Sequence, residues 1–474
     1  MVPHSLTPGD SLLTSVFKGE IGLAREDITP PPGIYARNWG LSRYDTADGV
    51  HRPLTATVLA LVGKGDAPPL LLVAADLGWW KSRDDERRVR GGLQAALGLS
   101  EAQVLISLSH THAGPSLYSD DAGKPGGEWI GPYLDRLRER LIAAARAAMA
   151  VRRPALLSWR YGRCDLARNR DLPEPGTARH VVGYHAEGSA DDTLLVGRIE
   201  DAADGRLLGT VVNYACHPTT LAWDNRLISP DFPGAMRETV EAATGAPSLF
   251  LQGASGELAP AEQYCGDAAV ADRHGRRLGH AVLAVLNGWS ERTQVFDRVV
   301  ESGAALAVTR PAAVLITDEA SASVQPVSLP LKPMPTVAEI EAKLAGCTDR
   351  ALGERLWRQR GVRRMVGDGA ALDLPLWIWR VGEAWVVASP GEAYSQLQTE
   401  VRRRFPGRPI VVLNVTNGYA GYLAPQDHAT RDQYSVWQSP FTPGALETLV
   451  LAVQTRLLRA LEMPAAAPLR PPSP

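Results

Sequence analysis

Two histidines, His110 and His112, lie two residues apart in the sequence Ser-His-Thr-His, in a chain that has only ten histidines. On an extended segment this spacing places both imidazoles on the same face. They could bind one metal ion together, or one could bind a metal while the other assists a reaction. A hydrogen-bonded pair at the end of a strand would have the same sequence. The following Gly114-Pro115 predicts an immediate turn, so we expect the pair near the surface or a cleft.

A third histidine and a carboxylate follow other apolar runs. His217 comes directly before Pro218, and Glu392 lies in a Pro-Gly-Glu sequence. Alone, His217 could be structural and Glu392 could cap the next helix. Two or three histidines with one carboxylate, however, form the ligand set of a catalytic zinc ion with an open position. Such an ion lowers the pKa of a bound water to ~7 and polarises a carbonyl. No HExxH motif of the helix-borne metalloproteases is present.

Two further segments have both a chemical and an ordinary interpretation. The segment from Gly253 to Glu257, Gly-Ala-Ser-Gly-Glu, is typical of a turn between a strand and a helix. Its amides could hold an oxyanion and Ser255 could contact a substrate, but a simple tight turn also explains it. The arginine-rich segment 350–364 predicts a solvated helix face, given the near-neutral net charge.

The elements that position these residues follow from hydrophobic patterns. Aliphatic runs that end at Gly, Pro or polar residues are typical of buried strands. Such runs begin at Pro69, Val104, Gly209, Pro247, Glu383 and Pro409. Helical periodicity covers 131–149, 232–243, 270–287, 336–344 and 446–461, with a capping box at Thr336. The alternation predicts an α/β fold of layered, mixed β-sheets with flanking helices.

The rare chemical residues share one position in this scheme, the carboxyl ends of the predicted strands. Ligands gather at these ends in open α/β sheets. The residues are His110, His112, His217, Glu392 and Tyr422. We therefore expect a metal site at the C-terminal ends of strands.

Composition narrows the class of protein. The 474 residues include 50 Lys+Arg and 52 Asp+Glu, so the formal charge of −2 gives no reason to expect nucleic acid or an anionic membrane as the main partner. Four cysteines without a CxxC pair exclude a disulfide scaffold and a thiolate zinc ribbon. No secretory signal and no long apolar segment are recognisable, so we expect a cytoplasmic enzyme without a transmembrane segment. We expect a loose N-terminus over 1–15, one large catalytic domain over 16–462 and a disordered Pro/Ala-rich tail over 463–474.

Four short motifs, in order along the chain, resemble the neutral/alkaline (non-lysosomal) ceramidase family, zinc amidases that cleave the N-acyl bond of ceramide. The motifs are Ser109-His-Thr-His-Ala-Gly-Pro115, Asn213-Tyr-Ala-Cys-His217, Pro390-Gly-Glu392 and Tyr419-Ala-Gly-Tyr422. The resemblance runs from Ile21 to about Leu461.

The resemblance implies roles for individual residues. The implied ligands of a single zinc ion are His110, His217, Glu392 and Tyr422. His112 would contact the reacting carbonyl, Tyr434 would be a second active-site tyrosine, and Arg170 would line the substrate site. Two departures separate the chain from the family: Ala259 replaces its catalytically important serine, and its C-terminal β-domain has no counterpart before the chain ends.

The leading hypothesis is a zinc-dependent hydrolase of a linear amide, possibly ceramide-like, that uses metal-activated water. His112 and Tyr434 would stabilise the oxyanion or move a proton, and Arg170 would orient a polar or anionic group of the substrate. One alternative is a metal-dependent ester or lactone hydrolase, or a biosynthetic enzyme that needs a Lewis acid. Another is a non-catalytic binding relative. The substrate would be a small or lipid-like N-acyl compound.

Overall fold

The computed structural model describes residues 15–65, 67–289, 294–300 and 307–462. The expected loose segment 1–15 therefore lies outside the described residues except for Ser15, which begins the first strand, and the expected tail 463–474 lies wholly outside them. None of the described helices is long and apolar enough to cross a membrane. All four cysteines are free.

The largest element is a nine-stranded mixed sheet. Its strands are β1 (Ser15–Asp27), β3 (Thr55–Val62), β4 (Leu70–Ala75), β5 (Val104–Leu108), β6 (Arg153–Arg163), β10 (Thr193–Asp201), β11 (Leu207–Tyr214), β13 (Ser248–Gln252) and β17 (Leu315–Thr317). The order is β13-β11-β10-β6-β1-β3-β4-β5, with β17 beside β1. The pairs β4–β5, β11–β13 and β1–β17 are parallel and the others are antiparallel. The edge strands β5 and β13 contact each other, so the ends of the sheet approach one another.

A four-stranded sheet packs against one face of the large sheet. It consists of β18 (Ala320–Pro330), β19 (Ala371–Val381), β20 (Ala384–Ala388) and β22 (Ile410–Leu413), in that order. The buried cluster between the sheets combines Trp377, Trp379 and Val411 with aliphatic side chains of the large sheet. Both indoles also donate hydrogen bonds, to the carbonyls of Glu101 and Ala102. Full burial of aromatic side chains with satisfied N–H groups fixes how the sheets face each other.

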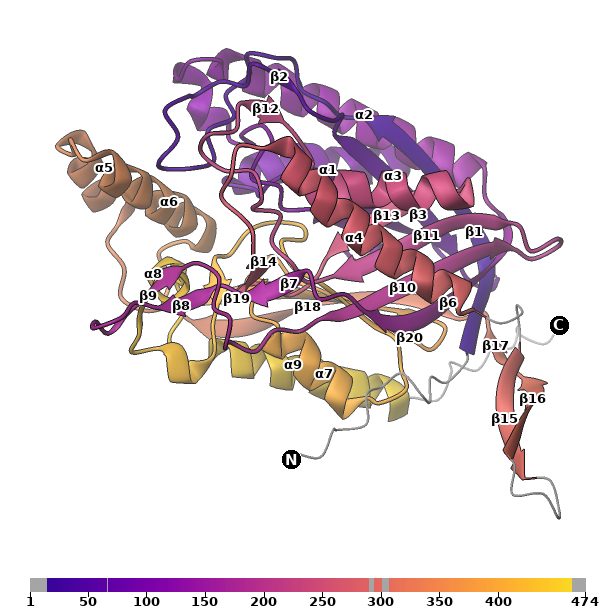
Figure 1. Cartoon of the computed structure of the whole chain (residues 1–474). Coiled ribbons are helices and arrows are strands. Elements are labelled where there is room, and N and C mark those ends of the chain that lie inside the picture. Colours follow the sequence, from indigo (N-terminus) through magenta and orange to yellow (C-terminus); the bar gives the residue numbers. More distant parts are fainter. Residues whose placement is uncertain (1–14, 66, 290–293, 301–306, 463–474) are drawn as a thin grey trace, which may run out of the picture.

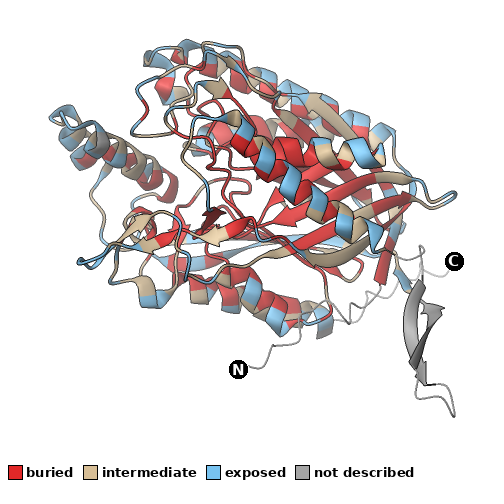
Figure 2. Cartoon of the chain, viewed as in Figure 1, coloured by how far each residue is buried: buried red, intermediate tan, exposed pale blue. Residues whose placement is uncertain are grey.

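Helices cover the outer face of each sheet, giving four layers (Figure 1). The large sheet carries α1 (Arg83–Leu97), α2 (Ile130–Ala150), α3 (Phe232–Thr244) and α4 (Ala268–Asn287). The small sheet carries α7 (Gln396–Arg404) and α9 (Ala445–Glu462). Figure 2 shows their buried sides turned towards the sheets and their exposed sides outward. The predicted α/β fold of layered, mixed sheets with flanking helices is confirmed.

A helical hairpin interrupts the small sheet between two paired strands. It consists of α5 (Val337–Ala345) and α6 (Arg350–Val366), and it stands out from the layered body in Figure 1. The hairpin leaves and rejoins the sheet at neighbouring points, because Pro330 of β18 pairs with Ala371 of β19. The predicted capping box is present: Thr336 accepts from the backbone N–H of Glu339, whose side chain accepts from Thr336 N at 2.8 Å.

The remaining elements are short. The strands are β2 (Gly49–Val50), β7 (Ala167–Asn169), β8 (Asp171–Pro173), β9 (Arg179–Val182), β12 (Leu227–Ile228), β14 (Leu258–Pro260), β15 (Gln294–Val300), β16 (Ala307–Ala313), β21 (Glu392–Ala393), β23 (Tyr422–Leu423) and β24 (Asp432–Gln433). The helices are η1 (Glu101–Gln103), η2 (Ser119–Gly123), η3 (Gly127–Trp129), η4 (Gln426–His428) and α8 (Tyr434–Gln438). Several of the short strands lie immediately beyond the ends of the long strands, where the chemically interesting residues gather.

Candidate metal centre

Strand ends from both sheets bring the predicted site residues together. His110 follows β5, and His217 follows β11, in the large sheet. Glu392 and Tyr422 follow β20 and β22 of the small sheet and begin the two short strands β21 and β23. These strands pair in parallel with Glu392 directly opposite Tyr422. The expectation of one shared site at carboxyl strand ends therefore agrees with the geometry.

The segment after β22 ties the two sheets together beside this site. The side chain of Asn417 donates to the carbonyl of Val104 at 2.8 Å and accepts from the N–H of Ile106 at 2.8 Å. Asn417 has a φ of +54°, in the left-handed region that asparagine tolerates better than most residues. His110 has a φ of +68°, which is uncommon for any residue except glycine. Strained backbone of this kind is typical of functional sites, where the surrounding contacts enforce it.

Two imidazoles face one carboxylate oxygen in the interior. Nε2 of His217 lies 3.0 Å from Oε2 of Glu392, and Nε2 of His110 lies 3.3 Å from the same oxygen. All three side chains are at least 97 % buried, with exposed fractions of 3 %, 1 % and 3 % for His110, His217 and Glu392.

The backbone contacts of the two histidines fix which ring nitrogen points inward. Nδ1 of His217 lies 2.6 Å from the carbonyl oxygen of Ser255, and Nδ1 of His110 lies 3.2 Å from that of Gly78. A carbonyl only accepts, so each Nδ1 donates its proton there, and the lone pair of a neutral ring lies on Nε2, on the side of Glu392. The two Nε2 atoms and the carboxylate oxygen of Glu392 then face one another. Nε2 of His110 indeed has no hydrogen-bond partner among the described residues. This donor set fits a divalent metal ion.

His112 lies beside the other two histidines. One ligand atom from each of His110, His112 and His217 falls within 4.8 Å of the others. Both ring nitrogens of His112 are buried and have no hydrogen-bond partner in the described part of the chain. The ring lies between two indoles, with centroid distances of 4.8 Å to Trp39 and 4.9 Å to Trp79. Desolvation holds the pKa of His112 well below its usual value, so the imidazole is neutral. It is therefore free either to complete a histidine triad or to contact a substrate.

Arg170 and Tyr422 lie behind the two imidazoles. Nη2 of Arg170 donates to the Tyr422 hydroxyl at 3.1 Å and to the carbonyl of Gly256 at 2.8 Å, and lies 3.2 Å from Nε2 of His217. Arg170 was expected to line the substrate site. Its guanidinium instead contacts two of the proposed metal ligands and is not among the residues that line the neighbouring pocket.

The glycine-rich turn does not have the structure expected from its sequence. It joins β13 to β14 rather than to a helix. Three of its amides already have acceptors, because Gly253 donates to Tyr214, Ala254 to Gln398 and Gly256 to Ala393. The hydroxyl of Ser255 accepts from Gln252, and its carbonyl accepts from His217. The turn thus orients His217 through the carbonyl of Ser255.

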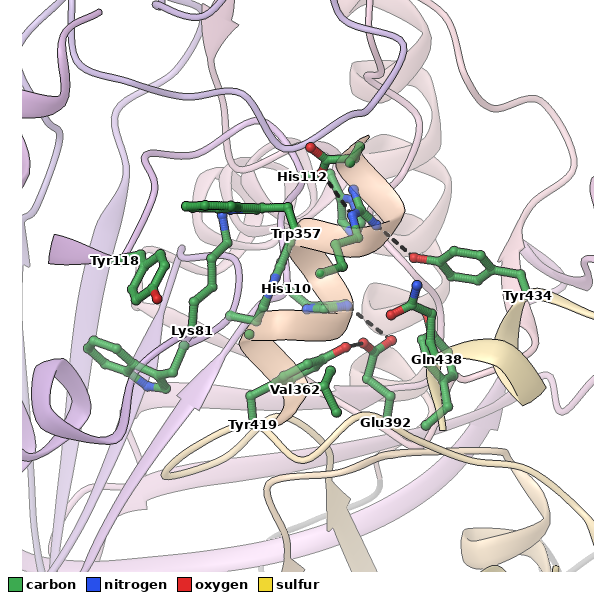
Figure 3. Close-up of a pocket in the computed structure, with 16 residues that line it drawn as sticks. Lys81, His110, His112, Tyr118, Trp357, Val362, Glu392, Tyr419, Tyr434 and Gln438 are labelled. Carbon is green, nitrogen blue, oxygen red and sulfur yellow. Dashed lines mark hydrogen bonds and ion pairs between the residues drawn. The ribbon is translucent and has the colours of Figure 1, made fainter. Parts of the chain in front are cut away.

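A pocket opens beside His110, His112 and Glu392, and its walls were largely missed from the sequence (Figure 3). The further lining residues are Trp79, Trp80, Lys81, Tyr118, Glu354, Trp357, Arg358, Gly361, Val362, Tyr419, Tyr422, Tyr434 and Gln438. Tyr419 donates to Oε1 of Glu392 at 2.7 Å. Its position three residues before Tyr422 could have indicated from the sequence that it belongs to the site.

The interpretation of the arginine-rich segment 350–364 as a solvated helix face was wrong for one side of α6, as the contacts of Arg358 show. Its Nη1 donates to the hydroxyl of Tyr434 at 2.7 Å, and Nε donates to Glu354 at 2.9 Å. The ring of Tyr434 lies 5.8 Å from that of Tyr422. Two further arginines of α6, Arg360 and Arg363, are also buried. One side of the helix therefore faces the pocket and the protein.

No protein-family model matches the chain. The neutral ceramidase of Pseudomonas aeruginosa is 26% identical over 253 residues, which is 50% of this chain and 36% of that relative. The chain thus matches only about a third of the length of this curated relative.

Solved structures share the fold over almost the whole chain. A crystal structure of neutral ceramidase from Pseudomonas aeruginosa has a TM-score of 0.69 at 17% identity, over 98% of this chain and 77% of that one. A structure described as ceramidase complexed with C2 has a TM-score of 0.68 at 16% identity, over 98% and 78%. The chain is therefore similar in sequence to a neutral ceramidase over half of its length, and it shares the fold of the two ceramidase structures over almost all of it.

Proposed function

We propose that the protein is a metal-dependent hydrolase of an amide bond in an N-acyl compound, with zinc as the expected metal. The observation that carries the proposal is the convergence of His110 Nε2, His217 Nε2 and Glu392 Oε2, at 3.3 Å and 3.0 Å from the carboxylate oxygen. The name of the matched relative, neutral ceramidase, supports amide cleavage. Mixed nitrogen and oxygen ligands suit zinc but also other divalent metals.

The residues that would hold the ion are His110, His217, Glu392 and Tyr422. A divalent ion in this position would polarise the substrate carbonyl and lower the pKa of a water molecule. Arg170 holds the Tyr422 hydroxyl and so positions it beside Glu392. The carbonyl of Ser255 holds the ring of His217 in the orientation that points Nε2 inward.

Two groups at the pocket wall would act on the substrate. His112 is neutral and has an uncommitted N–H, which would donate to the carbonyl oxygen as negative charge develops there. The hydroxyl of Tyr434 accepts from Arg358, so its own proton remains available for the departing nitrogen. Ala259 offers no hydroxyl, so the proposed mechanism uses no serine nucleophile. The proposed catalytic unit comprises residues 16–462.

The test combines metal analysis with a panel of acyl amides and matched esters. His110→Ala and Glu392→Ala should each lose bound metal and at least a hundredfold of amide turnover. His280→Ala, at an exposed position on α4, is the matched control and should retain both. Unchanged metal content and turnover in both site variants would overturn the proposal. Turnover of esters with inert amides would favour the ester or lactone alternative instead.

A further inference from the structure

Lys81 is a cation in the pocket that has no counter-charge. It follows β4 and lines the pocket together with His110 and His112. Its ammonium lies 3.4 Å from the hydroxyl of Ser116 and 5.2 Å from the ring centroid of Trp79. No carboxylate among the described residues forms an ion pair with it. Lys81 is only partly exposed, and a lysine in such a position without a carboxylate partner is uncommon, because desolvating an ammonium is costly.

The two nearest acidic side chains already have partners. Asp121 pairs with Lys124 at 2.9 Å and accepts from Ser116 at 2.6 Å. Glu354 pairs with Arg358 at 2.9 Å. Burial accordingly lowers the pKa of Lys81, which these two acids only partly offset. The amine of Lys81 therefore lies at a pocket rather than against an acidic partner among the described residues.

Arg358 adds a second cation around the same indole. Its guanidinium carbon lies 5.8 Å from the ring centroid of Trp79. Glu354, the Tyr434 hydroxyl and the carbonyl of Asn38 hold it in place. These three acceptors occupy three of the five N–H groups of a guanidinium. Figure 3 shows Lys81 on one side of His110 and Tyr434, the acceptor of Arg358, on the other.

Of the described Lys, Arg, Asp and Glu side chains that line the pocket, Lys81 is the one without an ion-pair partner. Lys81 and Arg358 contribute two positive charges, and Glu354 contributes one negative charge. Glu392 belongs to the metal centre. We propose that the pocket recognises N-acyl substrates that carry a carboxylate close to the scissile amide, and that Lys81 is its main partner. This inference rests on the proposed function and assigns its substrate class. A monoanion supplies the one missing charge, whereas the neutral head group of ceramide does not.

Matched probes test the preference. N-hexanoylglycine and its carboxamide share the scissile bond but differ in charge, and N-butylsuccinamic acid places the carboxylate on the acyl side instead. We expect kcat/KM to be at least tenfold higher for one of the two acids than for the carboxamide. The acid that is preferred tells which half of the substrate lies against Lys81. Lys81→Met should bring that ratio close to one, whereas Lys343→Met, at an exposed position on α5, should leave it unchanged.

Binding to metal-depleted protein separates this inference from the proposed function. Calorimetry should show that the preferred acid binds at least tenfold more tightly than the carboxamide, and that Lys81→Met or Arg358→Gln removes the difference. If the acid binds selectively but the metal-loaded protein does not cleave it, the proposed hydrolase function is contradicted and the proposed carboxylate-binding subsite stands. Equal binding of acid and carboxamide, or an unchanged ratio in both variants, would overturn the subsite whatever the turnover. Far-ultraviolet circular dichroism checks that each variant folds.

Discussion

At the scale of single residues, the protonation of two histidines decides what the site can hold. Nδ1 of His110 and of His217 each face a backbone carbonyl, so their lone pairs meet at Glu392. The types and spacing of these residues predicted a metal site from the sequence, and the family resemblance added Tyr422 to the expected ligands. The rings' orientation could not, because it depends on the carbonyls of Gly78 and Ser255, which only the folded chain brings there.

Tyr419→Phe should weaken metal binding by about tenfold to a hundredfold. The hydroxyl of Tyr419 donates to Oε1 of Glu392 at 2.7 Å, and groups that orient a ligand in this way usually contribute that much to affinity. Titration against a competing chelator measures the change. Tyr184→Phe, at a position that is 43% exposed, is the control. Equal affinity of Tyr419→Phe and the parent protein would refute this role.

Glu257 should make the stability of the protein depend on pH. Desolvation raises the pKa of its carboxyl from 4.5 to about 7, although Ser395 donates to it. The folded state therefore keeps a proton that the unfolded chain releases between pH 4.5 and 7. Stability from this group should fall as pH rises through that window, by about 3 kcal/mol in total.

Urea unfolding between pH 5 and 9 measures this effect. Glu257→Gln should remove most of the fall in the free energy of unfolding, whereas Glu187→Gln, at an exposed position, should preserve it. A parent protein whose stability is unchanged or rises between pH 5 and 7, with the same curve for Glu257→Gln, would contradict the raised pKa.

At the scale of elements, the α5–α6 hairpin forms a wall of the pocket without belonging to the layers. Its capping box at Thr336 was readable from the sequence. The sequence did not predict that one face of α6 points inward, because a high arginine content also suits a solvated helix. The burial of Arg358 depends on its contacts with Tyr434 and Glu354. The prediction that the turn after β13 leads into a helix was wrong for a similar reason. The turn leads into β14, and its amides contact residues that are distant in the sequence.

Replacing residues 332–369 by Asn-Gly should leave the layers and the metal centre intact. Leu331 and Ala370 already form a backbone hydrogen bond at 2.8 Å, so a two-residue turn can join β18 to β19. The shortened protein should bind one equivalent of metal but lose the preference for a carboxylate. Metal analysis and the matched probes measure both. Loss of metal from a shortened protein that still folds would show that the hairpin supports the centre itself.

At the scale of the whole molecule, the proposed ligands come from both sheets. His110 and His217 follow strands of the large sheet, whereas Glu392 and Tyr422 follow strands of the small one. Strand and helix patterns predicted layers, but not that two sheets would face each other through buried tryptophans. That arrangement depends on long-range packing, which periodicity along the chain does not contain.

Bound metal should therefore stabilise the whole fold. A ligand present at 100 times its dissociation constant adds about 2.7 kcal/mol to the free energy of unfolding if the unfolded chain does not bind it. Chelation should lower Tm by a few degrees, and added zinc should restore it. The same titration on His110→Ala should leave Tm unchanged. A parent protein whose Tm does not respond to chelator or zinc would contradict a metal that links the sheets.

The most direct test of the metal centre is anomalous diffraction from crystals of the zinc-saturated protein, at the zinc absorption edge. We expect one strong peak per chain within about 2.0 to 2.2 Å of Nε2 of His110, Nε2 of His217 and a carboxylate oxygen of Glu392. No peak among these three atoms, or a peak held by other residues, would contradict it.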